Sequence, residues 1–299
     1  MKFLRVPACG AGLCRPAFAV YRHALIGALA ILMAQAVWSA QDGDLKLVEP
    51  DSGLAGRLAA VGRVHAGHGA ELSMATGFLV SACHVLTAGH VLAKTGSPVR
   101  LGAEARFIPG GASPRANAAF PVYGRVVAAS QQFVMSVAPT GFDQQRIPND
   151  WALIELDHAI VGIDPIRLLY PAAPMASDIV YTVVGYPLGQ RRQGLFAQEH
   201  CRNWSTTHAG MSLKGVMIAD CAVQSGMSGG PVLLDDGTNL IAAGILVERF
   251  TIGQKVMAIG VPVAAFAEPI ETAMRDSEIC AAGSPFAWPG ILSPTPSTR

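Results

Sequence analysis

Hydrophobic positions beyond residue 57 fall into short runs, which polar, Gly-rich and Pro-rich clusters separate. Such runs between turn signals are typical of the strands of an all-β barrel or sandwich. The runs before residue 170 are Leu58–Val64, Thr76–Val85, Phe107–Ile108, Ala119–Ala128, Phe133–Val137, Trp151–Leu156 and Ile163–Leu169. The later runs are Ile179–Gly185, Gly194–Gln198, Gly215–Cys221, Pro231–Leu234, Leu240–Val247 and Lys255–Val263. The linker-like stretch 170–174 lies between the two sets, so the pattern predicts two β halves, 57–170 and 171–263.

The first 39 residues follow a different pattern, a basic leader and then an apolar run. The basic residues are Lys2, Arg5, Arg15 and Arg22. The apolar run, 24–37, is short for a membrane span, and the small residues before Ala40 suit cleavage of a secretory signal. We therefore expect 1–39 to be a signal peptide, with an uncleaved anchor as the alternative, and the mature protein to be secreted or periplasmic.

Three further segments flank the β halves. Residues 40–56 are polar and without periodicity, and are expected to form an exposed N-terminal segment. Residues 264–280 look helical, which predicts a C-terminal helix. Residues 281–299 are rich in Pro and Ser, and we expect a flexible tail.

Composition and charge agree with a globular β protein. Of the 299 residues 51% are hydrophobic and 14% are charged, with 32 Gly and 20 Pro. This gives an ample core and many turns. Without the leader the 22 Lys and Arg fall by four to 18, against 21 Asp and Glu, a balance of −3. Nothing in this balance indicates nucleic-acid binding.

A glycine-rich turn contains the serine of most interest. Residues 226–231 read Gly-Met-Ser-Gly-Gly-Pro, and an apolar run follows. Glycines permit a tight turn, which can point the Ser228 hydroxyl outward and aim the N–H groups of Gly226 and Ser228 at one point beside it. That is the arrangement of a nucleophile with an oxyanion hole. The other interpretation is a Gly-rich hairpin with an incidental serine.

A histidine and an aspartate lie upstream of this serine. His90 ends the sequence Thr-Ala-Gly-His after an apolar run, and Asp150 opens Asp-Trp-Ala-Leu. Asp143, Asp157 and Asp164 are rivals, but only Asp150 leads into such a strand. The order His, Asp, Ser, with spacings of 60 and 78 residues, resembles the trypsin/chymotrypsin-like serine peptidases. The bacterial secreted branches, which include the V8/glutamyl endopeptidase-like one, are closest in appearance.

The resemblance implies an all-β fold of two six-stranded antiparallel β-barrels with a C-terminal helix and an active site between the barrels. It implies that Ser228 is the nucleophile and that His90 is the general base and acid. Asp150 would orient His90 and stabilise the imidazolium. The N–H groups of Gly226 and Ser228 would form the oxyanion hole, and peptide hydrolysis would pass through an acyl-enzyme.

Several positions depart from the family pattern. Met227 stands where animal members have an aspartate that serves zymogen activation. Val247 replaces a serine that often supports the triad aspartate. Ala222 lies where trypsin has the acid that binds Arg or Lys, and Leu246 lies where glutamate-specific members have histidine. Neither a preference for Arg or Lys nor a preference for Glu is therefore supported.

The positions expected at the specificity pocket are Ala222, Leu246, Arg249 and Ala258. Arg249 would either attract an acidic side chain or point to solvent, so the specificity is open.

The cysteines and the remaining histidines indicate disulfides rather than metals. Cys83, Cys201, Cys221 and Cys280 follow the leader, and export permits disulfides. The resemblance to bacterial relatives favours a Cys201–Cys221 bridge. Cys83 is either a buried free thiol or the partner of Cys280. The His pairs 65/68 and 200/208 lack a convincing third ligand, so we expect no metal and no other cofactor.

These observations predict an exported serine endopeptidase that acts on protein or peptide substrates. We expect a monomer with no nucleic-acid partner and no membrane contact beyond the signal segment. The alternative is a catalytically silent relative that serves as a binding module, and the missing serine at Val247 keeps it open.

Overall fold

The computed structural model describes residues 45–68, 71–110, 120–136, 145–169, 179–190, 194–203, 215–252 and 255–283. The chain divides into two compact units, 1–43 and 44–299, and every described residue belongs to the second. The expected signal peptide, 1–39, and residues 284–299 of the expected tail lie outside the described residues. Within the described ranges no helix has both the length and the apolar character needed to cross a membrane.

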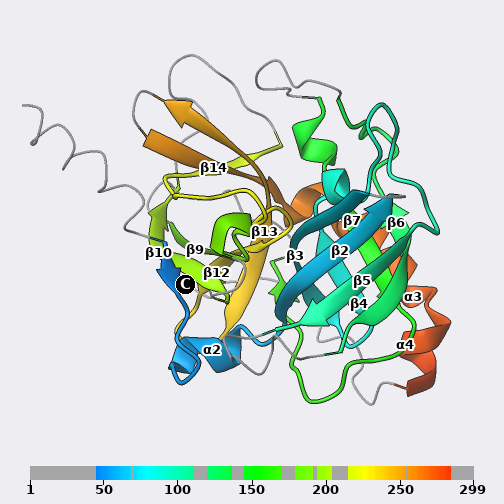
Figure 1. Ribbon diagram of the computed structural model, residues 1–299. Coiled ribbons are helices and arrows are strands. Elements are labelled where there is room, and N and C mark those ends of the chain that lie inside the picture. The colour runs from blue at the N-terminus through cyan, green and yellow to red at the C-terminus, as the bar shows by residue number, and fades with distance from the viewer. Residues whose placement is uncertain are drawn as a thin grey trace, which may run out of the picture. The chain divides into compact units, whose positions relative to one another are not determined.

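Six antiparallel strands close into a barrel in the first half (Figure 1). They are β2 (Val61–His68), β3 (Glu71–Ser81), β4 (His84–Thr87), β5 (Glu104–Pro109), β6 (Val122–Ala129) and β7 (Ala152–Leu156). They pair in the order β2-β3-β4-β7-β6-β5, and β5 pairs with β2. Alternate side chains of a strand point to opposite faces, and the barrel core includes the fully buried Val64, Phe78, Phe107 and Leu153.

The second half is an eight-stranded sheet. Its strands are β1 (Lys46–Leu47), β8 (Arg167–Leu168), β9 (Val180–Gly185), β10 (Phe196–Arg202), β11 (Met217–Ala219), β12 (Pro231–Asp235), β13 (Leu240–Ile252) and β14 (Lys255–Pro262). The main path is β1-β10-β9-β12-β13-β14-β11, and β8 pairs in parallel with β13. An isolated bridge between Asn203, just after β10, and Ala219 of β11 brings the ends of the six central strands together. The sheet is not formally closed, but the approach of its two ends is compatible with the expected second barrel. The expected all-β fold is confirmed.

Short helices occupy the connections and the C-terminus. They are α2 (Gly53–Arg57), η1 (Gly89–Val91), η3 (Ile147–Asn149), η4 (Leu188–Gln190), η6 (Val263–Ala265), α3 (Ala267–Arg275) and α4 (Glu278–Gly283). Figure 1 shows α3 and α4 beside the first barrel, and α3 contacts β6. The helix expected over 264–280 is thus two helices, because Asp276 and Ser277 interrupt it, and α4 extends three residues into the expected tail.

The segment 40–56, expected to be exposed, is partly packed into the second half. Lys46 and Leu47 pair with β10 as strand β1, and Leu45 and Val48 are buried. The hydroxyl of Ser52 caps α2 by accepting the Ala55 N–H at 3.2 Å. The expectation of exposure is wrong for these residues, because a two-residue strand is too short to show alternation in the sequence.

Three expected strands also differ. The run Thr76–Val85 forms β3 and β4, because the chain turns at Ala82–Cys83, where no typical turn residue marks the break. The run 163–169 contributes β8 to the second sheet instead of a strand to the first barrel. In the described part of 133–137, Val134 makes an isolated bridge with Pro98 and no strand forms.

Candidate active site

The pairing of β4 with β7 brings His90 and Asp150 together. Thr87 of β4 lies opposite Ala152 of β7, so the turn after β4 and the residue before β7 share one end of the barrel. The backbone N–H of His90 donates to Asp150 Oδ1 at 2.7 Å, and His90 Nδ1 lies 2.7 Å from Asp150 Oδ2. Asp150 therefore holds both the backbone and the ring of His90.

The environment of this pair suits a base. The side chain of Asp150 is 1% exposed and that of His90 is 23% exposed. Burial alone would lower the pKa of His90, but the charge and the hydrogen bond of Asp150 outweigh burial and raise that pKa above its ordinary value of 6.5. An Nδ1–H that donates to a carboxylate leaves Nε2 as the ring atom that can accept a proton.

Ser228 lies in a tight turn before β12. Gly226 and Gly229 have φ of 94° and 82°, a region that favours glycine. Two hydrogen bonds fix the turn to β13, from Gly229 N to Leu246 O at 2.7 Å and from Leu246 N to Gly230 O at 2.8 Å. Ser228 is partly exposed, while both of its neighbours are buried, so it is accessible from solvent.

The serine turn contacts the strand that leads to His90. A Cβ on Gly229 would lie 2.2 Å from Thr76 O and 2.8 Å from Ala88 N. Ala88 is two residues before His90, and the Thr76 N–H donates to Ser228 O at 2.9 Å. The His, Asp and Ser segments expected from the sequence therefore meet in one region, where residues of the two halves are in contact.

Hydrogen bonds also set the direction of two peptide groups in the turn. The carbonyl of Ser225 accepts the Leu188 N–H at 2.8 Å, and the carbonyl of Met227 accepts the Gly230 N–H at 2.9 Å. In a trans peptide the N–H points opposite to the carbonyl. The N–H groups of Gly226 and Ser228 therefore point away from these partners, and neither N–H donates a hydrogen bond within the described part of the chain.

Thr76 is a fully buried residue of β3 that the sequence analysis does not single out. Its hydroxyl donates to Gly226 O at 2.8 Å and accepts the Tyr186 N–H at 2.9 Å. These partners are backbone atoms 150 and 110 residues away in the chain. The only local signal is a threonine within an apolar run.

An ion pair joins the two halves near His90. Arg146 Nη2 lies 2.7 Å from Glu248 Oε2, and the two side chains are 11% and 29% exposed. Arg146 precedes η3, which ends directly before Asp150, and Glu248 lies on β13. Besides burial and Asp150, which act most strongly, Arg146 lowers and Glu248 raises the pKa of His90. This pair is therefore part of the electrostatic environment of the histidine.

The expected pocket residues have different surroundings. The Ala222 N–H donates to Gln198 Oε1 at 2.7 Å. Leu246 and Ala258 are buried in one hydrophobic cluster of the second half, and Arg249 is exposed on β13 opposite Ala258. This exposed position is compatible with both of the alternatives expected for Arg249, so its role stays a prediction.

Two disulfides join the four cysteines that lie within the described ranges. One links Cys201 of β10 to Cys221, seven residues before Ser228. The other links Cys83, in the β3–β4 turn, to Cys280 of α4. Cys83 is therefore not a free thiol, and α4 is tied to the first barrel.

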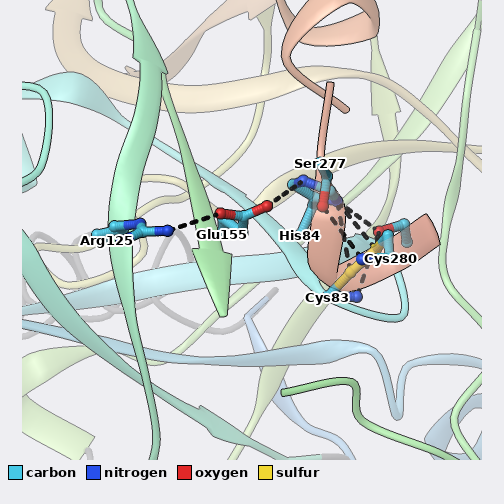
Figure 2. A network of polar contacts seen from close by, with 7 residues as sticks. Cys83, His84, Arg125, Glu155, Ser277 and Cys280 are labelled. Carbon is cyan, nitrogen blue, oxygen red and sulfur yellow. Dashed lines mark hydrogen bonds and ion pairs between the residues drawn. A yellow bond between two sulfur atoms is a disulfide. The ribbon is translucent and has the colours of Figure 1, made fainter. Parts of the chain in front are cut away.

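Figure 2 shows a polar network at the second disulfide. The fully buried His84 has Nδ1 2.8 Å from Ser81 Oγ and Nε2 3.9 Å from Glu155 Oε1. Burial lowers the pKa of His84 to about 4, against the opposite effect of Glu155. Among the described residues Cys83, His84 and Cys280 form the one group whose ligand atoms lie close enough for a metal. Because both sulfurs are in the disulfide, this group does not suit a metal.

Comparisons with known proteins bear on the family and the fold. The model of the family described as trypsin-like peptidase domain matches residues 75–242, more than half of the chain. No curated protein sequence matches the chain.

Solved structures share the fold at low sequence identity. Protease Anisep from Arthrobacter nicotinovorans is 16% identical with a TM-score of 0.53, over 74% of this chain and 98% of the other. A Glu endopeptidase in complex with MPD is 18% identical with a TM-score of 0.52, over 78% and 97%. The scabies mite inactivated protease paralogue S-I1 is 16% identical with a TM-score of 0.55, over 78% and 99%.

Proposed function

The chain belongs to the trypsin-like peptidase family, and on that premise we propose that it is an exported serine endopeptidase. The family and the fold support a protease. The observation that carries the finer proposal is the pair of His90 and the buried Asp150 at 2.7 Å, on a segment that the turn of Ser228 contacts.

The first chemical step would form an acyl-enzyme. The Ser228 Oγ–H proton would pass to His90 Nε2 while Oγ attacks the carbonyl carbon of the scissile bond. The negative charge on the carbonyl oxygen would be stabilised by the N–H groups of Gly226 and Ser228. Collapse of this intermediate would break the C–N bond, and the amine would leave with the proton from His90.

The second step would hydrolyse the acyl-enzyme. Water would give a proton to His90 Nε2 and attack the acyl carbon, and the proton would return to Ser228 Oγ as the carboxylic acid leaves. Asp150 would keep Nδ1 protonated throughout, so that Nε2 remains the atom that exchanges protons. Two bonds from His90 to one buried carboxylate support this role.

An extended peptide could lie along β13. Pairing of β12 with β13 runs as far as Pro231 opposite Ile245, and among the described strands only β14 pairs with β13 at Glu248 and Arg249. At Glu248 and Arg249, the edge of β13 opposite β14 is therefore suited to pairing with an extended substrate strand. Ala222 and Leu246 carry no charge, so we expect neither the preference of trypsin nor that of glutamate-specific members.

Export is supported by two independent features. The disulfides Cys83–Cys280 and Cys201–Cys221 form and persist in oxidising compartments, and the leader 1–39 has the pattern of a secretory signal.

The test is labelling of the purified mature protein with a fluorophosphonate, measured by intact mass. We expect one adduct per molecule on the wild type and none on Ser228→Ala. Ser73→Ala, a serine of β3 outside the site, is the matched control and should label like the wild type. A folded wild type that gives no adduct would overturn the proposal.

That negative result would favour the alternative, a catalytically silent protein that binds through the same fold. The scabies mite neighbour is named an inactivated protease paralogue, so the fold accommodates such proteins. Here the residue after Leu246 is Val247, which has no hydroxyl to offer Asp150.

A further inference from the structure

Thr76 makes hydrogen bonds to three residues in two segments of the second half, although it belongs to β3 of the first barrel. Its hydroxyl donates to Gly226 O at 2.8 Å and accepts the Tyr186 N–H at 2.9 Å. Its backbone N–H donates to Ser228 O at 2.9 Å. One fully buried residue therefore holds both donor residues of the candidate oxyanion hole by their carbonyls.

The same residue is bonded to the histidine strand. The Thr87 hydroxyl donates to Thr76 O at 2.8 Å, and Thr87 is three residues before His90 at the end of β4. The serine turn and the histidine strand thus share Thr76 as a common partner. A change in its bonds would alter the position of the nucleophile turn relative to the base.

Gly226 needs this support because its own backbone offers little resistance to rotation. Its φ of 94° is one of several conformations that glycine adopts at low cost. The carbonyl of Ser225 is bonded to Leu188 on one side. On the other side, the Thr76 hydroxyl is the hydrogen-bond partner recorded for the carbonyl of Gly226 among the described residues. The N–H of the same peptide, that of Met227, donates to Gln224 O at 3.1 Å. Loss of the hydroxyl would therefore remove one of the two bonds that hold this peptide.

A side chain at Gly226 would not solve the problem. A Cβ there would lie 2.6 Å from Tyr186 O and 2.8 Å from Leu188 N. The chain must keep glycine at this position, and the rigidity has to come from a neighbour. The hydroxyl of Thr76 bonds Tyr186 and Gly226 at once, so it fixes the spacing between the two segments that enclose the turn.

We infer that Thr76 is a positioning residue of the oxyanion hole, which orders the N–H groups of Gly226 and Ser228 through a buried hydroxyl contributed by the other barrel. The inference rests on the proposed function. Thr76 touches no reacting atom, and its contribution is to the rate of steps that build negative charge on the carbonyl oxygen. Removal of one oxyanion donor slows such steps by about 10²–10³-fold, so disorder of the hole should cost about 10–10²-fold.

The test compares Thr76→Val, Thr76→Ser and the wild type in fluorophosphonate labelling and in hydrolysis of an activated ester. Thr76→Val removes the hydroxyl at nearly constant shape, and we expect kcat to fall about 10–10²-fold with KM little changed. Thr76→Ser keeps the hydroxyl and should retain at least half of the wild-type rate. A role in packing alone predicts no such rescue, because serine lacks the methyl group.

Loss of stability needs its own control. Val126→Ala removes buried side-chain volume from β6, on a strand that contributes no residue to the site. At a temperature where all variants are folded by circular dichroism, it should label like the wild type. If Thr76→Val does not fold, Thr76→Ala takes its place, because its smaller side chain leaves room for a water on Gly226 O and Tyr186 N.

The outcomes separate the two proposals. Slow labelling of Thr76→Val with rescue by serine supports the inference. Labelling of Thr76→Val at the wild-type rate overturns the inference while the proposed function stands. A folded wild type that does not label overturns the proposed function, and the role of Thr76 in catalysis falls with it.

Discussion

The two carboxylate oxygens of Asp150 hold His90 at two points, the backbone N–H and ring Nδ1. These two donors fix the carboxylate, and Val247 has no hydroxyl to add a third bond. The carboxylate is thereby fixed in orientation without a serine at position 247. This is a residue-scale reason to expect an active base in spite of that departure from the family pattern.

The pH profile of labelling tests the charge on His90. Burial lowers its pKa, but Asp150 raises it by more, and the net pKa lies above 6.5. Since only neutral imidazole accepts the serine proton, the labelling rate should fall as the pH drops through a midpoint above 6.5. This decrease is the acid limb of the profile. We expect to see it when the labelling rate is measured at a series of pH values between 5 and 9.

Asp150→Asn is the companion variant. Its remaining oxygen can still accept the His90 backbone N–H, which places the amide NH₂ against Nδ1 and makes Nδ1 an acceptor. The proton then sits on Nε2, the wrong tautomer for a base, and the rate should fall roughly 10³–10⁴-fold. Labelling of Asp150→Asn at the wild-type rate would remove Asp150 from the mechanism.

At the scale of elements, η3 connects the acid to the other half of the molecule. It contacts β14. Its Pro148 also lies against Gly215, since a Cβ added to Gly215 would be 3.4 Å from the Pro148 side chain. The Arg146–Glu248 ion pair lies at its start. The short helix directly before Asp150 is therefore anchored on the half that carries Ser228.

The ion pair has a predictable effect on the acid limb. After burial and Asp150, Arg146 lowers and Glu248 raises the pKa of His90. Glu248→Gln should therefore move the limb to lower pH, and Arg146→Gln should move it to higher pH. The limb of the double variant should lie near that of the wild type, because both of the opposite effects on the pKa of His90 are then removed.

Arg57→Gln provides the control for these shifts. Arg57 makes an ion pair with Asp235 at 2.8 Å on the surface of the second half, and neither residue is among the groups that shift the pKa of His90. Its profile should match the wild type. Limbs that move in the same direction in Glu248→Gln and Arg146→Gln would contradict the electrostatic explanation.

The elements also show where the sequence is informative. The apolar runs predict most strands, and the three motifs place His90, Asp150 and Ser228 at turns that the structure brings together. The turn at Ala82–Cys83 escapes prediction because it has no Gly, Pro, Asn or Asp. The role of Thr76 escapes because its partners are backbone atoms more than 100 residues away, and no local pattern encodes such a contact.

At the scale of the molecule, the disulfide Cys83–Cys280 ties the last described helix to the first barrel. His84 lies directly beneath it and is fully buried, and its Nε2 has no hydrogen-bond partner among the described residues. Glu155 is the charged group that faces it, at 3.9 Å, and Arg125 pairs with Glu155 at 3.6 Å on the side away from His84 (Figure 2). Burial keeps this imidazole neutral at pH 7 and gives the fold a dependence on pH.

The sign of that dependence follows from the pKa. Burial lowers the pKa of His84 to about 4 in the folded state, from 6.5. Between these values the unfolded chain binds the proton and the folded chain does not, so stability is full above pH 6.5 and falls as the pH drops toward 4. A shift of this size corresponds to about 3 kcal/mol.

Denaturant unfolding at pH 7.5 and pH 4.5 measures this loss. The wild type should lose about 2–3 kcal/mol more than His84→Gln between the two values. His158→Gln, which replaces an exposed histidine of the same half, should lose as much as the wild type. If His84→Gln and the wild type lose equal stability, the buried imidazole is not the acid-sensitive group, and the carboxylates of the first barrel become the groups to test.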